Sequence, residues 1–205
     1  MRFAEKLGER ILPNPLEKNA ICPLCKSQVI SKCGEIKVWH WAHKTSEDCD
    51  NWGGRETDWH LNWKAEFPEE MQEVTIGKHR ADVRIKDIVL EFQSSPISSE
   101  DIKEREEFYG KMKWVLDGKK FAENRLFREK KGFLTFRWKW AHKSWVDCSC
   151  PLYFDLGIST FGDGMLSHKL FLVRKIYWDG RVGGWGKIVS KETFMEECHH
   201  GYYRN

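Results

Sequence analysis

The chain has 205 residues, of which 40% are hydrophobic and 32% are charged, and its formal net charge is +3. This length fits one compact domain, or a medium domain with a small module. Because it has no run of about 18 apolar residues and its N-terminal segment lacks an apolar core, we expect neither a membrane span nor a signal peptide. Seven cysteines in such a chain favour a reducing compartment, with metal binding over disulfides, so we expect a cytoplasmic protein.

A chain this weakly basic can bind nucleic acid only where its positive charge is concentrated. The stretch from Lys111 to Lys143 meets this condition. It holds Lys119, Lys120, Arg125, Arg128, Lys130, Lys131, Arg137, Lys139 and Lys143. The 11 tryptophans fit either packing in half-buried strands or stacking on bases, and both interpretations stay open.

The first half of the chain alternates cysteine-rich, helical and strand-like segments. Residues 1–16 are expected to form a short leader, and residues 17–50 hold four of the seven cysteines. A helix is predicted at 55–66, strands at 71–76, 81–85 and 88–92, and a second helix at 98–112. Ser98 and Ser99 are good N-cap residues for that second helix.

The second half is expected to be rich in strands between glycine-rich turns. Strands are predicted at 113–116, 133–138, 152–156, 170–176 and 187–189. This mixture of elements predicts an α/β or α+β class. We expect a module at 1–50, a core at 51–145 and a β-rich C-terminal extension at 146–205.

The segment Cys22-Pro-Leu-Cys25 is a CxxC knuckle, whose two thiolates can reach one tetrahedral Zn²⁺. The other ligands are expected among His40, His43 and Cys49, with Cys33 a weaker candidate. The set Cys22, Cys25, His43 and Cys49 is preferred over the set Cys22, Cys25, His40 and His43. In an extended run, residues three apart point to opposite faces, so one histidine faces away.

A structural zinc ion suits this segment, because such a short stretch cannot fold on apolar burial alone. The alternative is a redox CxxC, which is expected beside a βαβ unit instead of a loop-rich segment. Cys148 and Cys150 could bind a second metal with Cys198, His199 or His200, although chance is the simpler explanation.

Two carboxylates are expected to face each other across a hairpin. If Lys86 and Asp87 form a two-residue turn, Asp82 lies directly opposite Glu91. Such carboxylates repel, and a protein tolerates that cost where a cation sits between them. Carboxylate oxygens with open positions for water suit Mg²⁺ or Mn²⁺. Gln93 has the same parity as Glu91 and projects on the same face.

The predicted helix at 55–66 carries Glu56, His60 and Lys64, each four residues from the next. They form one polar stripe. A carboxylate, an imidazole and an ammonium group would suit a metal ligand, a proton shuttle and a phosphate contact. An ordinary solvated helix face with i,i+4 pairing is the alternative.

Taken in order, these segments resemble the CoiA-like competence-protein family, a branch of the PD-(D/E)xK nuclease superfamily. The resemblance covers roughly residues 20 to 118. The matching pieces are Cys22-Pro-Leu-Cys25, His40-Trp-Ala-His43, Glu56 to His60 with Lys64, Arg80-Ala-Asp82-Val, Glu91-Phe-Gln93-Ser-Ser-Pro-Ile-Ser, Arg105 with Tyr109, and Trp114-Val-Leu-Asp-Gly.

The resemblance implies a restriction-endonuclease-like PD-(D/E)xK core, an N-terminal zinc-ribbon-like module and a metal-dependent nuclease acting on nucleic acid, with DNA the expected substrate. Asp82 and Glu91 would hold catalytic Mg²⁺ or Mn²⁺, with Glu56 a possible third ligand, and the zinc would be structural. Gln93 would position the attacking water.

The remaining roles follow from the same resemblance. Lys64 would contact the scissile phosphate, and His60 would shuttle a proton or support Glu56. Arg80 and Arg105 would contact phosphate or brace the carboxylates. Gln93, however, stands where the superfamily motif has lysine and carries no charge. The competing hypothesis is therefore a catalytically silent module that binds nucleic acid or protein.

Overall fold

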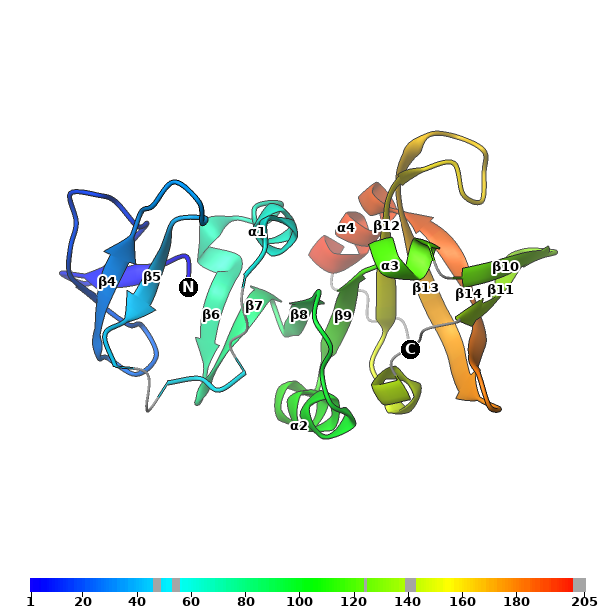
Figure 1. The fold of residues 1–205 in the computed structure, drawn as a ribbon, viewed down its shortest axis with the longest axis horizontal. Helices are drawn as coiled ribbons and strands as arrows, with labels where there is room; N and C mark the ends of the chain where they lie inside the picture. The colour runs from blue at the N-terminus through cyan, green and yellow to red at the C-terminus, as the bar shows by residue number, and fades with distance from the viewer. Residues whose placement is uncertain (46–48, 53–55, 124, 139–142, 201–205) are drawn as a thin grey trace. The chain divides into compact units, whose positions relative to one another are not determined.

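The computed structural model describes residues 1–45, 49–52, 56–123, 125–138 and 143–200, and it divides the chain into two compact units, Met1–Arg84 and Ile85–Asn205 (Figure 1). Arg55, the first residue of the predicted helix at 55–66, and Lys139 of the predicted basic stretch lie outside the described residues. The elements form an α+β protein that is mostly sheet, which confirms the coarse class. Among the described residues, none of the helices has the length and apolar character that crossing a membrane requires.

The first unit begins with a five-stranded antiparallel sheet in the order β2-β1-β3-β4-β5. Its strands are β1 (Ala4–Lys6), β2 (Glu9–Ile11), β3 (Ala20–Ile21), β4 (Gln28–Lys32) and β5 (His40–His43). The expectation of a leader at residues 1–16 was wrong, because β1 and β2 lie within it. Leu7 and Gly8 both have positive φ, 53° and 83°, which gives the twist of a two-residue hairpin turn.

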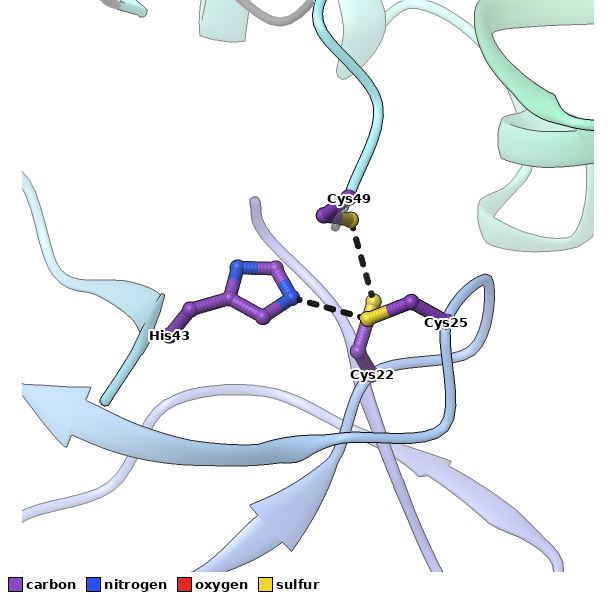
Figure 2. A group of neighbouring side chains, drawn as sticks. All are labelled: Cys22, Cys25, His43 and Cys49. Atoms are coloured by element: carbon purple, nitrogen blue, oxygen red, sulfur yellow. Dashed lines mark hydrogen bonds between the residues drawn. The ribbon is translucent and has the colours of Figure 1, made fainter. Parts of the chain in front are cut away.

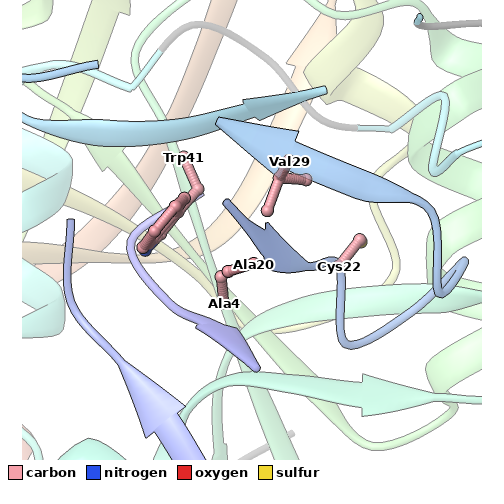
Figure 3. Close-up of a cluster of buried hydrophobic side chains, with 5 residues drawn as sticks. All are labelled: Ala4, Ala20, Cys22, Val29 and Trp41. Carbon is pink, nitrogen blue, oxygen red and sulfur yellow. The ribbon is translucent and has the colours of Figure 1, made fainter. Parts of the chain in front are cut away.

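A small hydrophobic cluster lies under this sheet (Figure 3). Ala4, Ala20, Cys22, Val29 and Trp41 are its buried members. Trp41 is the only large side chain of the five, and its indole Nε1 donates to the Ile11 carbonyl at 3.1 Å. So little apolar area supports a fold poorly without an added constraint such as a metal.

The first unit continues with α1 (Asp58–Lys64), the 3₁₀ turn η1 (Glu69–Met71) and the antiparallel hairpin of β6 (Gln72–Ile76) and β7 (His79–Ile85). The two strands predicted at 71–76 and 81–85 are confirmed. The helix is shorter than predicted because Thr57 is extended and caps it. The Thr57 side chain accepts from the His60 backbone while the His60 ring accepts from the Thr57 backbone, which forms a capping box.

The second unit is built on a sheet whose strands lie in the order β10-β11-β14-β13-β12-β9-β8. The strands are β8 (Ile88–Gln93), β9 (Met112–Asp117), β10 (Arg125–Lys130), β11 (Phe133–Trp138), β12 (Leu152–Ser159), β13 (Ser167–Trp178) and β14 (Val182–Ser190). Their pairing is parallel for β8 with β9 and for β9 with β12, and antiparallel for the rest. All six strands predicted beyond residue 87 are confirmed.

Helix α2 (Ser99–Tyr109) connects β8 to β9, as predicted, and the Ser98 side chain caps it by accepting from the Asp101 backbone at 3.0 Å. Three further helical segments were not predicted: α3 (Lys119–Glu123), η2 (Lys143–Asp147) and α4 (Lys191–His200). The core of this unit is aromatic. Phe121 of α3 stacks on Phe154 of β12 with ring centroids 4.1 Å apart.

Candidate metal centre and candidate active site

Three cysteines and one histidine converge at the edge of the first sheet (Figure 2). Cys22 and Cys25 flank the knuckle between β3 and β4, His43 ends β5, and Cys49 follows it. Their ligand atoms all lie within 4.8 Å of one another. The Sγ atoms of Cys22 and Cys49 are 3.8 Å apart, and the Sγ of Cys25 is 3.3 Å from Nε2 of His43.

The knuckle is shaped by its backbone. The Lys26 amide donates to the Cys22 carbonyl at 3.0 Å, and the Cys22 amide donates to the Ser27 carbonyl at 2.9 Å. Lys26 has a φ of 59°, which turns the chain back sharply after Cys25. This turn brings both thiols of the CxxC segment to one side.

The other donors that the sequence offered point elsewhere. The Nδ1 of His40 lies 2.8 Å from the Val38 carbonyl, and the thiol of Cys33 lies 2.9 Å from the Ser31 hydroxyl. Of the two expected sets, the structure therefore assembles the one with Cys49. Cys148 and Cys198 have other neighbours: the Cys148 thiol donates to Glu106 at 3.1 Å.

The acidity of the thiols differs across the cluster. Burial acts to raise the pKa of Cys25, but hydrogen bonds from Ser27, His43 and Cys22 lower it to about 6. Burial raises the pKa of Cys49 to about 12. A low thiol pKa would also suit redox chemistry, but four donors around one point favour a structural metal such as zinc, which binds thiolates and neutral imidazole.

A second cluster in the first unit surrounds Lys64 at the end of α1. Its Nζ contacts a carboxylate oxygen of Glu56, lies 2.9 Å from Oε1 of Glu73 and lies 3.7 Å from Oδ1 of Asp82. The side chains of Lys64 and Glu73 are 1% and 3% exposed, whereas those of Glu56 and Asp82 are 23% and 24% exposed. One buried ammonium group therefore holds three carboxylates, two of which reach the surface.

Glu73 is held by more than Lys64. Its carboxylate accepts from the backbone amide of Arg2 at 2.8 and 2.9 Å and from that of Phe3 at 3.3 Å, and Nε of Arg80 lies 4.0 Å away. Burial acts to raise the pKa of Glu73, but the charges of Lys64 and Arg80 outweigh it and hold the pKa well below its usual range. Burial acts to lower the pKa of Lys64, and the three carboxylates raise it instead.

The helical stripe predicted for Glu56, His60 and Lys64 needs correction. Because Thr57 is the N-cap of α1, Glu56 lies before the helix and is not part of its polar stripe. The Glu56 carboxylate still contacts the Lys64 ammonium group. His60 is buried, and its Nδ1 lies 2.9 Å from the Thr57 hydroxyl. On this side of the ring, His60 supports the start of the helix.

The segment after Cys49 joins the metal cluster to β7. The Asp50 carboxylate lies 2.9 Å from Nδ1 of His79 and accepts from the backbone amide of Arg80 at 2.8 Å. The ring of Trp52 stacks on that of His79. The metal cluster and the Lys64 cluster are thus tied into one compact unit.

The other predicted site residues belong to the second unit. Oε2 of Glu91 accepts from Nη1 of Arg105 at 3.1 Å, and both side chains are buried. The side-chain amide of Gln93 donates to the carbonyl and the hydroxyl of Ser95 at 2.9 and 3.0 Å. The pairing of Asp82 with Glu91 involves both units and stays a prediction.

Glu73 was missed at the level of sequence, although a signal for it was present. Gly77 and Lys78 separate β6 from β7, so Ile76 pairs with His79 and Gln72 with Val83. The register argument applied to Lys86 and Asp87 would, at this earlier turn, place Glu73 beside Asp82. That step would have predicted a carboxylate pair within a single hairpin.

Two protein-family models match the chain, the first over the metal cluster and the second over most of the Lys64 cluster. The family model of the N-terminal domain of competence protein CoiA matches residues 13–51, and that of the nuclease-like domain of the same protein matches residues 58–155. No curated protein and no solved structure matches the chain.

The first match contains all four donors of the metal cluster, and the second contains Lys64, Glu73 and Asp82. These findings define a protein with a Cys₃His module ahead of a nuclease-like domain. Since the two models together match about two thirds of the chain, it belongs to the CoiA-like competence-protein family.

Proposed function

We propose that this protein is a Mg²⁺- or Mn²⁺-dependent nuclease of PD-(D/E)xK type that hydrolyses phosphodiester bonds, with DNA as its substrate. The observation that carries the proposal is the cluster of Glu56, Glu73 and Asp82 around Lys64. Lys64, Glu73 and Asp82 lie in the segment that the nuclease-like family model matches. Charged groups this poorly solvated are expensive to keep, and they gather at functional sites more often than elsewhere.

The donor set fits a hard divalent cation. Three carboxylates face Lys64, Arg80 and the N-terminal ammonium group of Met1, which lies 3.7 Å from Oε2 of Glu56. Glu56 and Asp82 reach solvent, and hydrated Mg²⁺ is usually bound through one or two carboxylates. When bound there, the metal would lower the pKa of a coordinated water and stabilise charge on the phosphate.

The buried groups act on these two carboxylates. Lys64, at 1% exposure, orients Glu56 and Asp82, and its burial favours this positioning role over the direct phosphate contact expected from the sequence. Glu73 keeps Lys64 charged and in place. Arg80, near Glu73, contributes a second positive charge behind the carboxylates.

Residues of the second unit are assigned to the same reaction from sequence resemblance. Glu91 is proposed as a metal ligand, and its contact with Arg105 supports a bracing role for that arginine. Gln93 is proposed to position the attacking water. The Cys₃His cluster is proposed to bind zinc and to act in folding instead of in catalysis.

The proposal is tested by cleavage of labelled single- and double-stranded DNA by zinc-loaded protein with Mg²⁺, with Mn²⁺ or with neither. Wild type is compared with Asp82→Ala and with the control Asp87→Ala, whose carboxylate is exposed and contacts Lys111. We expect metal-dependent cutting that Asp82→Ala abolishes and Asp87→Ala retains. Cutting by Asp82→Ala would contradict the assignment, and binding without cutting by wild type would support a catalytically silent module.

A further inference from the structure

One face of the second unit's sheet carries three large aromatic side chains that lie outside the hydrophobic core. In β14, Gly183, Trp185 and Lys187 alternate with residues that face inward. Trp185 pairs with Thr135 of β11 and with Lys175 of β13, and Gly183 pairs with Arg137 and Tyr177. Cross-strand partners share a face. We call the set of Phe133, Arg137, Lys175, Tyr177, Trp185 and Lys187 the aromatic face.

The rings of this face are partly exposed to solvent. Phe133 and Trp185 are each 37% exposed and Tyr177 is 36% exposed. Phe133 and Trp185 contact each other edge to face, with centroids 5.7 Å apart. Large aromatic side chains that stay partly exposed together on one sheet face are costly in water, so their grouping points to an interaction surface.

Cations are interleaved with the rings. The Arg137 guanidinium lies over the Tyr177 ring, 5.5 Å from its centroid, and is itself held by Asp179 at 2.6 and 3.0 Å. Lys175 and Lys187 are exposed beside Trp185. Gly183 leaves room for this arrangement, because a Cβ there would lie 3.0 Å from Cδ of Arg137. Rings flanked by exposed cations suit a ligand with flat bases and anionic phosphates.

A groove of about 390 Å³ adjoins the face and shares Trp185 and Lys175 with it. Its opposite wall is the segment after η2, including Cys148 and Ser149. That wall is fixed by the Glu106 carboxylate, which accepts from the backbone amides of Ser149 and Cys150 at 2.9 and 3.2 Å. The groove is thus formed before any ligand binds, and its volume suits a base or nucleotide.

We infer that the aromatic face and this groove bind single-stranded nucleic acid, with bases stacked on Trp185, Tyr177 and Phe133 and phosphates near Lys175 and Lys187. Bases in a duplex are stacked on one another and do not expose their faces, so the platform selects single strands. The inference rests on the proposed function for its choice of nucleic acid, and it assigns to that function a single-stranded substrate.

The test is fluorescence anisotropy of a labelled oligothymidylate of about 15 nucleotides, without Mg²⁺ or Mn²⁺ and with zinc-loaded protein. Trp185→Ala is expected to weaken binding about 5- to 150-fold, the range that loss of one stacked base gives. Trp185→Phe, which keeps a ring, is expected to retain most of the affinity. Trp178→Ala is the matched control, because Trp178 is 47% exposed but pairs with buried Val182 on the opposite face.

A second measurement separates stacking from charge. Lys175→Gln is expected to reduce the slope of log K against log salt by about 0.7, the value for one phosphate of a single strand, whereas Trp185→Ala leaves that slope unchanged. Equal loss in Trp178→Ala, unchanged affinity in Trp185→Ala, or tighter binding of duplex DNA would overturn the inference. The inference would also be overturned if the wild-type protein bound no oligonucleotide and formed a dimer that Trp185→Ala dissociates. The face would then be an interface between copies of the chain.

Binding and cleavage fail independently in this design. A protein that binds oligothymidylate through Trp185 but never cuts DNA supports the platform and contradicts the nuclease. A protein that cuts DNA, loses cutting in Asp82→Ala and binds equally well without the Trp185 ring supports the nuclease and overturns the platform.

Discussion

Among single residues, Glu73 has the most demanding surroundings. The Glu73 backbone has a positive φ of 47°. Its carboxylate is buried and is surrounded by Lys64, Arg80 and two backbone amides. Each of these groups stabilises the ionised form, and together they outweigh the cost of removing the charge from water. The ionisation of Glu73 is therefore coupled to the folding of the whole first unit.

This coupling predicts the behaviour of Glu73→Gln. Removing one partner from a buried ion pair costs about 3 kcal/mol, so the free energy of unfolding at pH 7, measured with urea, should fall by about that amount. Because the pKa is lowered on folding, the Glu73 contribution is complete above the unfolded value of about 4.3 and is lost as the pH falls through the lower folded value. Wild type should therefore lose stability more steeply than Glu73→Gln on acidification from about pH 5.

The control for this comparison is Glu70→Gln, since Glu70 is exposed in the nearby 3₁₀ turn. It should leave both the stability at pH 7 and the acid slope close to wild type. Parallel acid slopes for wild type and Glu73→Gln would contradict the ionised, buried state.

The two histidines of β5 make a second prediction at this scale. His43 Nε2 lies among the cysteine thiols, whereas His40 Nδ1 lies against the Val38 carbonyl. We expect one zinc ion per chain in wild type and in His40→Ala, and loss of tightly bound zinc in His43→Ala, as measured by elemental analysis after dialysis. Zinc retained by His43→Ala but lost from His40→Ala would show that the other ligand set is correct.

At the scale of elements, β14 owes its close packing to glycine. A Cβ on Gly184 would lie 2.0 Å from the Lys175 carbonyl oxygen and 2.8 Å from the Phe136 ring. A Cβ on Gly186 would lie 2.2 Å from the Leu172 carbonyl oxygen. A larger residue at either position would push the neighbouring strand away, so these glycines set the spacing of the sheet.

The neighbouring pair Gly183 and Gly184 tests this. Gly184→Ala should lower the free energy of unfolding by about 1–3 kcal/mol, because backbone and a buried ring must move. Gly183→Ala should cost less, since its nearest atoms belong to the flexible, exposed Arg137 side chain, at 3.0 and 3.1 Å. Urea unfolding measures both, and an equal cost for the two variants would show that backbone conformation, not contact, decides.

For the whole molecule, the important division is the one after Arg84. The Cys₃His module and the Lys64 cluster lie in the same compact unit. Two ties join them: the amides of Arg2 and Phe3 bind Glu73, and Asp50, next to Cys49, binds the start of β7. Loss of the metal should therefore also disorder the carboxylate cluster around Lys64.

Removal of zinc by a chelator tests this with hydrogen exchange read by mass spectrometry. We expect faster exchange in residues 20–45 and also in α1, β6 and β7, because Glu73 loses the ordered segment before β1 whose amides donate to it. Strands β12 and β13 should keep their protection and serve as the internal control. Faster exchange confined to residues 20–45 would show that the module and the hairpin are energetically separate.

Local signals in the sequence determined most elements. Alternating apolar residues predicted β7, and Ser98 predicted the start of α2, because periodicity and capping depend on near neighbours. The β1–β2 hairpin escaped because Leu7-Gly8 is not a typical turn dipeptide. Helix α4 escaped because its buried residues Phe194, Glu197 and Cys198 make a weak apolar stripe.

By itself the sequence also indicated the metal site and the family, since CxxC spacing and ordered motifs are local properties, but it left two donor sets open. Only the tertiary structure decided which residues enclose Lys64 and which aromatic rings stay open. Glu73 takes its amides from residues about 70 positions away, and Trp185 gains its neighbours from β11 and β13. Periodicity shows which face of an element is apolar. Whether another segment covers that face depends on contacts between residues far apart in the chain.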